Sequence, residues 1–224
     1  MPDSEPPFLK PFPCVPSEKV YEPDDLAAPI VWSDFFSGNG ARAHWPEAQP
    51  PVEVEIGCGN GRYLCRASAE RSGHLFVGIE RSEAFARRSR DRMVKFGVEN
   101  VRIVRADAPT FLESHFSPGS IYDLHVYFTD PWPKRRHARR RIFQPAFVEL
   151  IHRLLRPGGR VFVKVDLHWY FEEIFGRFET SPRFEVVACG MDARRNWDIL
   201  ETTCFEQKAL AKTGRTYYLV ARSI

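Results

Sequence analysis

Short apolar runs and longer amphipathic stretches alternate along the chain from residue 51 onward. Runs of four or five mostly apolar residues predict seven strands, over 52–56, 75–79, 101–104, 124–128, 161–165, 184–188 and 217–221. Apolar residues at helical spacing predict helices over 63–71, 82–97, 142–155 and 170–178. Alternating strands and helices are typical of parallel pairing through helical crossovers. The pattern therefore predicts an α/β fold with a doubly wound, mostly parallel, seven-stranded sheet.

Residues 1–50 differ from the rest of the chain. They hold many of the 18 prolines and lack a sustained hydrophobic period. Such a composition is typical of chain that forms no core of its own. We therefore expect an extended or partly disordered N-terminal arm over 1–50 and one folded domain over 51–224.

Composition narrows the class of protein. Hydrophobic residues make up 43% of the 224 residues, enough for a core, and no apolar stretch is long enough to span a membrane. The five cysteines form no Cys-x-x-Cys pair, so neither a metal site nor a disulfide framework is indicated. The first residues lack the basic region and apolar core of a secretory signal. We expect a cytoplasmic location.

A glycine-rich turn follows the first predicted strand, in the sequence Glu55-Ile-Gly57-Cys-Gly59-Asn-Gly61. Glycine is required where the backbone takes positive φ or comes close to a ligand. The spacing differs from the G-x-G-x-x-G of dinucleotide sites, which present a pyrophosphate to a helix N-terminus. An acid before the turn suits a cationic group, such as the amino acid part of S-adenosylmethionine. A tight turn without any ligand is the simpler alternative.

Two further acids follow the next two predicted strands. Glu80 stands where a carboxylate can accept both hydroxyls of a ribose, and Asp107 could accept from an adenine amino group. Each also has an ordinary explanation, Glu80 as an acid favoured by the dipole of the following helix and Asp107 as an N-cap. Three acids at consecutive strand ends on one edge of a sheet are jointly less expected by chance. With the glycine spacing, they favour S-adenosylmethionine over NAD.

The segment 127–141 places a carboxylate beside dense positive charge. Asp130 follows the fourth predicted strand, Pro131-Trp132-Pro133 comes next, and six Lys or Arg residues with one His lie within 134–141. The other 26 Lys and Arg are fewer than the 29 Asp and Glu, so the net charge of +3 comes from this run. Strand-end carboxylates are typical of α/β active sites, and clustered cations bind phosphates. The segment favours an enzyme acting on nucleic acid, the alternatives being a solvated basic helix start or a nuclear address.

Together these motifs resemble the tRNA (guanine-N7-)-methyltransferases of the bacterial monomer type. The matching motifs run over 51–208 and are Glu55-Ile-Gly-Cys-Gly-Asn-Gly61, Gly78-Ile-Glu80, Asp107-Ala108, Asp130-Pro-Trp-Pro-Lys134-Arg-Arg-His137, Arg140-Arg141, Asp166 and Thr203-Cys-Phe-Glu206. The block from Asp130 to His137 is highly specific, whereas many other methyltransferases share the glycine motif. The resemblance implies a class I, Rossmann-like methyltransferase domain over 51–224. It also implies S-adenosyl-L-methionine as cofactor and a guanosine of the tRNA variable loop as substrate.

The resemblance implies roles for individual residues as well. Those that would hold the cofactor are Glu55, Gly57, Gly59, Gly61, Glu80, Asp107, Ala108 and Asp130. Those that would hold the substrate are Lys134, Asp166, Thr203, Phe205 and Glu206. Those that would contact RNA phosphates are Arg135, Arg136, His137, Arg139, Arg140 and Arg141. No metal is implied, and the enzyme would act as a monomer or homodimer without a partner subunit.

Asp130 would lie in the reaction centre. Guanine N7 carries a lone pair and no proton, so methyl transfer to it needs alignment rather than a general base. A fixed carboxylate can accept from the guanine N1 and N2 hydrogens and can stabilise the positive charge that develops on the purine. Two residues depart from the family. Thr129 stands where the family usually has Pro, and Cys204 where many members have Lys.

Two alternative functions share these motifs. One is a methyltransferase that acts on another structured RNA, and the other is a non-catalytic RNA-binding subunit with the same fold. Intact Glu55, Glu80 and Asp130 argue against the second, because a subunit without activity would be free to lose them. Measured cofactor binding would separate the subunit from the two enzymes, and the position of the methylated base would separate the enzymes from each other.

Overall fold

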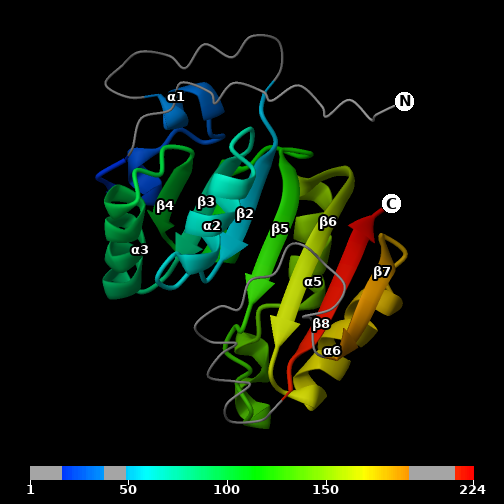
Figure 1. Ribbon diagram of the computed structural model, residues 1–224. Helices are drawn as coiled ribbons and strands as arrows, with labels where there is room; N and C mark the ends of the chain where they lie inside the picture. Colours follow the sequence, from blue (N-terminus) through cyan, green and yellow to red (C-terminus); the bar gives the residue numbers. More distant parts are fainter. Residues whose placement is uncertain (1–16, 38–48, 192–214) are drawn as a thin grey trace, which may run out of the picture.

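The computed structural model describes residues 17–37, 49–191 and 215–224, and within them one eight-stranded sheet organises the molecule. Its order is β1-β4-β3-β2-β5-β6-β8-β7 (Figure 1). The strands are β1 Val20–Tyr21, β2 Val52–Ile56, β3 Leu75–Glu80, β4 Val101–Arg105, β5 Ile121–Tyr127, β6 Leu155–Val165, β7 Phe184–Met191 and β8 Tyr217–Ser223. From β1 to β6 the neighbours pair in parallel, and β8 runs antiparallel to β6 and β7.

All seven predicted strands are present, and the α/β class with a mostly parallel sheet is confirmed. The expected seven strands become eight because the two-residue β1 joins the edge, where it pairs with β4. The segment 156–159, which contains Pro157, Gly158 and Gly159, lies inside β6. There the pairing with β5 jumps from Leu155 to Arg160, so that the segment between them is a bulge.

Helices cover both faces of the sheet. They are α1 Trp32–Phe36, α2 Arg62–Glu70, α3 Glu83–Lys95, α4 Ala108–His115, α5 Pro145–Leu154 and α6 His168–Glu179, with 3₁₀ helices η1 Pro23–Asp25 and η2 Arg135–Arg140. Four of the α-helices match predicted ones, whereas α1 and α4 were not predicted. The helix α4 is short, but Asp107 stands at its N-cap, a proline lies in its first turn, and Phe111 and Leu112 are buried against the sheet.

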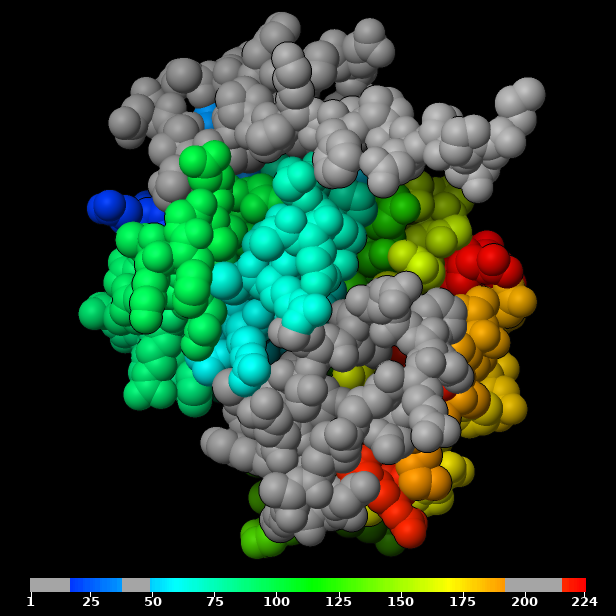
Figure 2. Space-filling model, in the orientation of Figure 1, coloured from blue at the N-terminus to red at the C-terminus, as the bar shows by residue number. Residues whose placement is uncertain are grey.

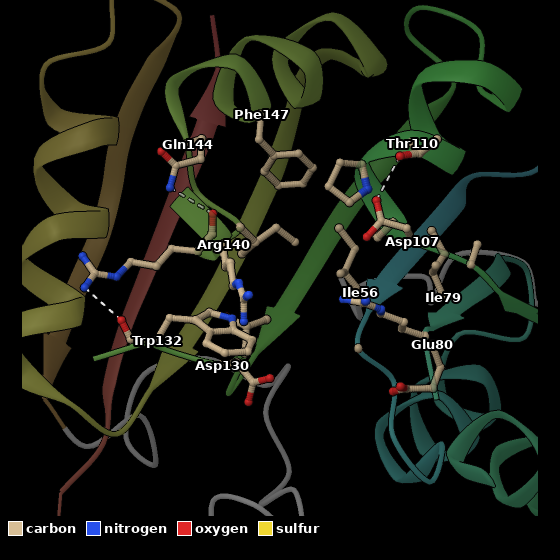
Figure 3. Close-up of a pocket in the computed structure, with 18 of the residues that line it drawn as sticks. Ile56, Ile79, Glu80, Asp107, Thr110, Asp130, Trp132, Arg140, Gln144 and Phe147 are labelled. Carbon is tan, nitrogen blue, oxygen red and sulfur yellow. Dashed lines mark hydrogen bonds between the residues drawn. The ribbon is translucent and has the colours of Figure 1, made fainter. Parts of the chain in front are cut away.

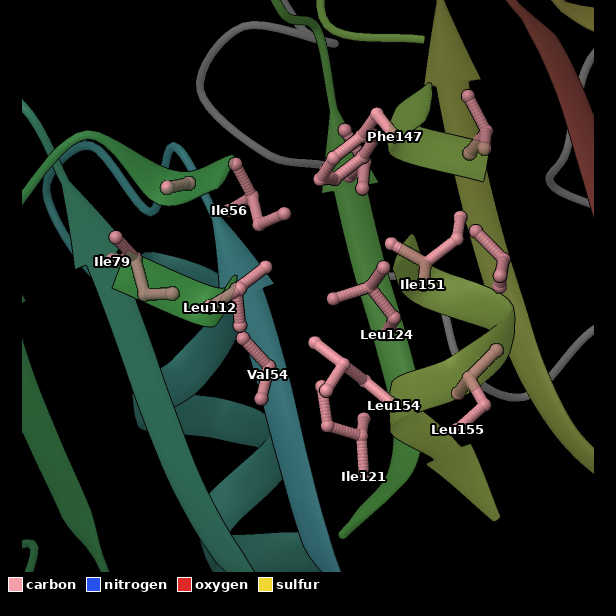
Figure 4. Packing of buried hydrophobic residues seen from close by; sticks show 14 of the residues in the cluster. Val54, Ile56, Ile79, Leu112, Ile121, Leu124, Phe147, Ile151, Leu154 and Leu155 are labelled. Atoms are coloured by element: carbon pink, nitrogen blue, oxygen red, sulfur yellow. The ribbon is translucent and has the colours of Figure 1, made fainter. Parts of the chain in front are cut away.

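Two apolar clusters hold these layers together. The larger joins α1, α4, α5 and α6 to one face of the sheet, and Figure 4 shows its centre, where Leu112, Leu124 and Ile151 approach one another over β2 and β5. The smaller joins α2 and α3 to the opposite face. That face is the one seen in Figure 2, on which α2 and α3 lie side by side. Burial of this kind contributes about 25 cal/mol per Å² of apolar surface.

The described part of the expected arm packs onto the domain. Trp32, Phe35 and Phe36 of α1 are buried in the larger cluster. The buried guanidinium of Arg102, on β4, donates to the backbone carbonyls of Phe35 at 3.0 Å and Phe36 at 2.9 Å. These bonds satisfy both a buried cation and the end of a short helix. Residues 17–37 therefore belong to the folded unit, while the boundary expected at residue 51 stays a prediction.

The sheet brings the predicted strand-end acids to one edge. Because β2, β3, β4, β5 and β6 are parallel, their carboxyl ends meet on the same side of the molecule (Figure 1). No helix within the described ranges is long and apolar enough to cross a membrane. The same ranges contain no group of three His, Cys, Asp or Glu side chains arranged to hold a metal ion.

Candidate functional site

One large pocket opens at this edge of the sheet, with a volume of about 1310 Å³. Its wall on one side comes from the ends of β2 and β3 and the start of α4. The opposite wall comes from the segment that follows β5, from η2 and from α5. Figure 3 shows Glu80 and Asp107 on the first wall and Asp130, Trp132 and Arg140 on the second. The pocket therefore joins the glycine-rich turn to the basic segment.

The glycine turn takes a conformation that other residues rarely adopt. Gly57, Gly59 and Gly61 have φ of 72°, 55° and 70°. A Cβ on Gly57 would meet no atom within 4 Å, so its backbone faces open space. A Cβ on Gly61 would lie 2.2 Å from the Ser89 hydroxyl oxygen, because the turn packs tightly against α3. The first glycine leaves room for a ligand, and the last brings the turn against the helix.

Glu80 ties the turn in place. Its Oε2 accepts from the backbone N–H of Gly59 at 2.9 Å, and its Oε1 accepts from the backbone N–H of Ser82 at 2.8 Å. The same carboxylate lines the pocket. Since each oxygen has a second lone pair, the side chain can still accept from ligand hydroxyls.

Glu55 is an ionisable group buried under the turn. Its side chain does not line the pocket, although its neighbours Ile56 and Gly57 do. The residue is 4% exposed, and its Oε2 has no hydrogen-bond partner among the described residues. Burial, reinforced by the charge of Glu80, raises the pKa of Glu55 to about 8. A buried carboxylate without a partner is costly, so a cationic ligand group would stabilise it here.

Asp107 is exposed and stands at the start of α4. Its Oδ2 accepts from the hydroxyl of Thr110 at 3.0 Å, a bond drawn in Figure 3. Asp107, Ala108 and Thr110 all line the pocket. Asp107 therefore stands at the N-cap of α4 and also lines the pocket, where its exposed carboxylate can contact a ligand.

Asp130 lies in a backbone segment of unusual conformation. The residues two before and two after it, Phe128 and Trp132, have φ of 53° and 45°. Non-glycine residues rarely adopt such values, and they persist where the surrounding contacts enforce them. Phe128 is fixed by a bond from its N–H to the carbonyl of Lys164 at 2.8 Å. Asp130 itself is exposed and faces the pocket (Figure 3).

Thr129, a departure from the resembled family, gains a partner in this structure. Its Oγ1 lies 3.5 Å from the hydroxyl of Tyr170 on α6. Burial raises the pKa of Tyr170, so the phenol stays protonated and able to donate. The contact anchors the residue directly before Asp130 to a helix of the core.

The basic run forms the 3₁₀ helix η2 and its flanks. Four of its cations are exposed and, within the described part of the chain, make no side-chain hydrogen bond or ion pair: Lys134, Arg135, Arg136 and Arg139. Arg140 places its guanidinium over the Trp132 ring, 4.8 Å from the centroid, and His137 meets the same ring edge-on at 5.7 Å. Arg141 turns inward, unlike its neighbours.

Comparison with known proteins gives the family. A model described as putative methyltransferase matches residues 49–219. A tRNA (guanine-N(7)-)-methyltransferase from Synechococcus sp. (strain JA-2-3B'a(2-13)) is 32% identical over 170 residues, covering 70% of this chain and 71% of that protein. The chain belongs to the tRNA (guanine-N(7)-)-methyltransferase family.

A second relative agrees with this family, and a solved structure shares the fold. The Thermotoga maritima relative of the same description is 30% identical over 196 residues, 88% of this chain but 58% of that protein. The crystal structure of a SAM dependent methyltransferase from Aquifex aeolicus matches with a TM-score of 0.54 at 12% identity. It covers 78% of this chain and 82% of that one, and shows that the fold is that of a methyltransferase.

The residues expected from the family fall into three groups. Those that line the pocket are Gly57, Gly59, Glu80, Asp107, Ala108, Asp130, Arg139, Arg140 and Arg141. Those that are described but lie off its wall are Glu55, Gly61, Lys134, Arg135, Arg136, His137 and Asp166. Thr203, Phe205 and Glu206 lie outside the described residues. The roles assigned to all of them stay predictions.

Sequence reasoning missed the partners on α6. Tyr170 contacts Thr129 from 41 residues further along the chain, and Glu173 contacts Arg141 from 32 residues further along. Nothing in the helix pattern of 170–178 distinguishes them from other helix residues. It also missed a buried charge cluster around Glu53, for which the alternation Val52-Glu-Val-Glu-Ile56 in a buried strand was a usable signal.

Proposed function

We propose that this chain transfers a methyl group from S-adenosylmethionine to N7 of a guanosine in tRNA, in the variable loop. The observation that carries the proposal is the single pocket that joins Glu80 and the glycine turn on one wall to Asp130 on the other. Both relatives described above carry the printed name tRNA (guanine-N(7)-)-methyltransferase. We expect the enzyme to act in the cytoplasm, as a monomer or homodimer.

The cofactor half of the site fits the group that the family implies. The buried, unpartnered oxygen of Glu55 suits a positively charged amino group. Glu80 lines the pocket with lone pairs to spare for ribose hydroxyls, and Asp107 stands where an adenine amino group could donate. When bound, S-adenosylmethionine would supply an activated methyl group on its sulfonium. The chain itself supplies orientation and a pocket partly shielded from water.

Asp130 would serve the guanine. Because N7 has no proton to lose, the carboxylate need not act as a base. It would accept from the N1 and N2 hydrogens and thereby fix the purine in plane. It would also stabilise the positive charge that appears on the ring as the new bond forms. The contact between Thr129 and Tyr170 anchors the segment in which Asp130 lies.

The exposed cations of the basic run would hold the RNA. Guanine N7 lies in the major groove, which is deep and narrow in A-form RNA, so the target must be in a loop or unstacked. Lys134, Arg135, Arg136 and Arg139 are free to contact phosphates around such a loop. Asp166, Thr203, Phe205 and Glu206 would complete the substrate side, as the family resemblance implies.

The test is methyl transfer to unmodified tRNA transcripts, followed by nuclease digestion and mass spectrometry. We expect 7-methylguanosine in the variable loop, and its loss in Asp130→Ala. Asp91→Ala, which changes an exposed carboxylate on α3, is the matched control and should keep activity. Transfer to another position or another RNA would favour a different RNA methyltransferase. Cofactor binding without transfer to any RNA would favour a non-catalytic subunit.

A further inference from the structure

We propose that Arg141, held by Glu173, is a positioning residue that fixes the backbone beside Asp130, and that it is not a phosphate ligand. The proposal rests on the proposed methyl transfer and deepens it, because it names two residues that set the orientation of Asp130. It removes Arg141 from the group of cations expected to contact RNA.

Each of the three guanidinium nitrogens of Arg141 donates a hydrogen bond inside the protein. Its Nε donates to the carbonyl of Pro131 at 2.9 Å, and its Nη2 donates to the carbonyl of Trp132 at 3.1 Å. Its Nη1 donates to Glu173 on α6. The side chain is 11% exposed, and the guanidinium lies over the ring of Trp169, 4.8 Å from its centroid. With three of its N–H groups bonded in this way, the guanidinium is directed at the backbone and Glu173 rather than at the surface where a phosphate would bind.

The two carbonyls that Arg141 holds follow Asp130 directly. They belong to the segment in which Trp132 has a φ of 45°, a conformation that needs outside support. The bond to Nη2 is drawn in Figure 3 beside the Trp132 ring. Gln144 closes the other side of the segment by donating to the carbonyls of Ala138 at 2.9 Å and Arg141 at 3.0 Å. The chain from 131 to 141 is thereby folded back onto itself.

The helix α6 contacts both sides of Asp130. Tyr170 reaches Thr129 before it, and Glu173, one helical turn later, reaches Arg141, which holds the two residues after it. Glu173 is 27% exposed and also lies 3.8 Å from Arg177. Through Arg141, the position of the core helix α6 therefore fixes the position of the backbone around Asp130. Misplacement of a reacting group by about 1 Å can cost about a hundredfold in rate.

The two possible roles of Arg141 predict opposite effects for Glu173→Gln. If Arg141 bound phosphate, removal of a competing carboxylate would leave it freer and strengthen tRNA binding. If Arg141 positions the segment, the same change loosens it and slows the chemistry. Arg141→Lys adds a test that keeps the charge but loses the fork that spans two carbonyls. Arg139→Ala is the matched control, since Arg139 is exposed and free of partners in the described structure.

The experiment combines single-turnover methyl transfer at saturating tRNA with measured dissociation constants for tRNA and S-adenosylhomocysteine. We expect Glu173→Gln and Arg141→Lys to lower the rate constant by about tenfold or more. Both dissociation constants should stay within about twofold, and the salt dependence of tRNA binding should not change. Arg139→Ala should instead weaken tRNA binding and lower the salt slope by about 1. An unchanged rate constant in Glu173→Gln, or tighter tRNA binding by that variant, overturns the proposal.

Amide hydrogen exchange gives a second readout that needs no activity. We expect both variants to speed exchange at the amides of residues 128–130 and 132, with exchange in β2 and β3 unchanged. Arg139→Ala should leave exchange unchanged in both regions. If the unaltered protein made no 7-methylguanosine, the proposed function would fail while this readout still decided the role of Arg141. Unaltered exchange in both variants would show that the pair does not hold the segment.

Discussion

Glu80 accepts a hydrogen bond from Gly59, 21 residues earlier in the chain, at 2.9 Å, and so couples the end of β3 to the glycine turn after β2. The other carboxylate oxygen holds the start of α3 through Ser82. One side chain thus organises the turn and also offers acceptors to the pocket. Loss of the carboxylate should therefore harm both the shape of the site and the binding of a ligand.

We expect Glu80→Gln to weaken the binding of S-adenosylhomocysteine by about tenfold to a hundredfold. The amide keeps one acceptor but sets a donor against the N–H of Gly59 or Ser82, and hydrogen bonds to charged groups are worth about 1.5–3 kcal/mol. Calorimetric titration measures the affinity. Glu83→Gln, at an exposed acid of α3 that pairs with Arg87, is the control and should bind normally. Equal affinities in the two variants would contradict this role of Glu80.

Cofactor binding should release a proton from Glu55. Its pKa of about 8 means that the group is largely protonated at pH 7, whereas pairing with an amino group requires the carboxylate. Affinity for S-adenosylhomocysteine should therefore rise between pH 6 and pH 7.5. Calorimetry in buffers of different ionisation enthalpy measures the proton. We expect release from the unaltered protein and much less from Glu55→Gln, and equal release in both would refute the pairing.

The same group predicts how stability changes with pH. The folded-state pKa of Glu55 lies above its ordinary value of 4.5, so the folded protein holds this proton more tightly than the unfolded chain. The resulting stabilisation is complete below about pH 4.5 and is lost as pH rises through 8. Relative to Glu55→Gln, the unaltered protein should thus lose free energy of unfolding between pH 6 and pH 9. Urea unfolding at several pH values would measure the trend, and a flat difference would contradict it.

Glu53 should behave in the opposite way. It is buried, but bonds from His125 at 2.9 Å, His74 at 2.6 Å and Arg71 at 2.8 Å surround it. Burial alone would raise the pKa of Glu53, and these partners outweigh it and hold the pKa far below its usual range. The stabilisation is therefore present above about pH 4.5 and lost as pH falls below it.

We expect Glu53→Gln to cost about 3–5 kcal/mol of unfolding free energy at pH 7, because it leaves the half-buried Arg71 without its counter-charge and disrupts the bonds with His74 and His125. The cost should shrink below pH 4.5. Glu70→Gln, which breaks an exposed pair with Arg66, should cost less than about 1 kcal/mol. Urea denaturation at pH 7 and pH 4 would compare the variants. A cost that did not depend on pH would show that packing, rather than charge, dominates at Glu53.

Gly61→Ala should destabilise the protein by about 2–4 kcal/mol. The methyl group would collide with the Ser89 side chain and with Met93, and alanine resists the φ of 70°. Gly176→Ala is the matched control, since a Cβ there would meet no atom within 4 Å and alanine favours the helix α6. It should be neutral or stabilising by up to about 1 kcal/mol. Similar melting temperatures for the two variants would contradict the tight packing of the turn.

The exposed cations should make tRNA binding strongly dependent on salt. We expect Arg136→Ala to weaken tRNA binding across tRNA species and to reduce the slope of log affinity against log salt by about 1. The rate constant at saturating tRNA should stay close to that of the unaltered protein. Filter binding at 50–200 mM salt would measure the slope. An unchanged slope would place Arg136 outside the RNA contact.

Much of this architecture was predictable from local patterns. Buried parallel strands such as Leu75–Glu80 are short apolar runs, and the acids that follow them must meet at one edge once the strands are parallel. The family resemblance rested on the same strand ends. The helix α4 escaped because its eight residues offer too little periodicity, and β1 because two residues form no pattern at all.

The directions of individual side chains were not predictable. Arg139 and Arg141 look equivalent in a basic run, yet Arg139 is exposed and Arg141 turns inward. Arg141 does so because it donates hydrogen bonds to Glu173 and to the carbonyls of Pro131 and Trp132. Those partners are set by the packing of α6, not by neighbouring sequence. Likewise, Glu80 accepts a hydrogen bond from the backbone N–H of Gly59, in a turn 21 residues earlier in the chain. Local sequence around Glu80 does not indicate this bond.

The stretch that the family model matches is shorter than the stretch that packs into the fold of this protein. The family model begins at residue 49, but the aromatic side chains of α1 fill the sheet's larger cluster, and the carbonyls at its end accept from Arg102. A fragment trimmed to residues 49–219 would expose apolar surface of this cluster and would remove the two acceptors that α1 provides to the buried Arg102. Shortened forms, chimaeras and domain transplants should therefore keep residues 17–37 rather than begin where the family model begins.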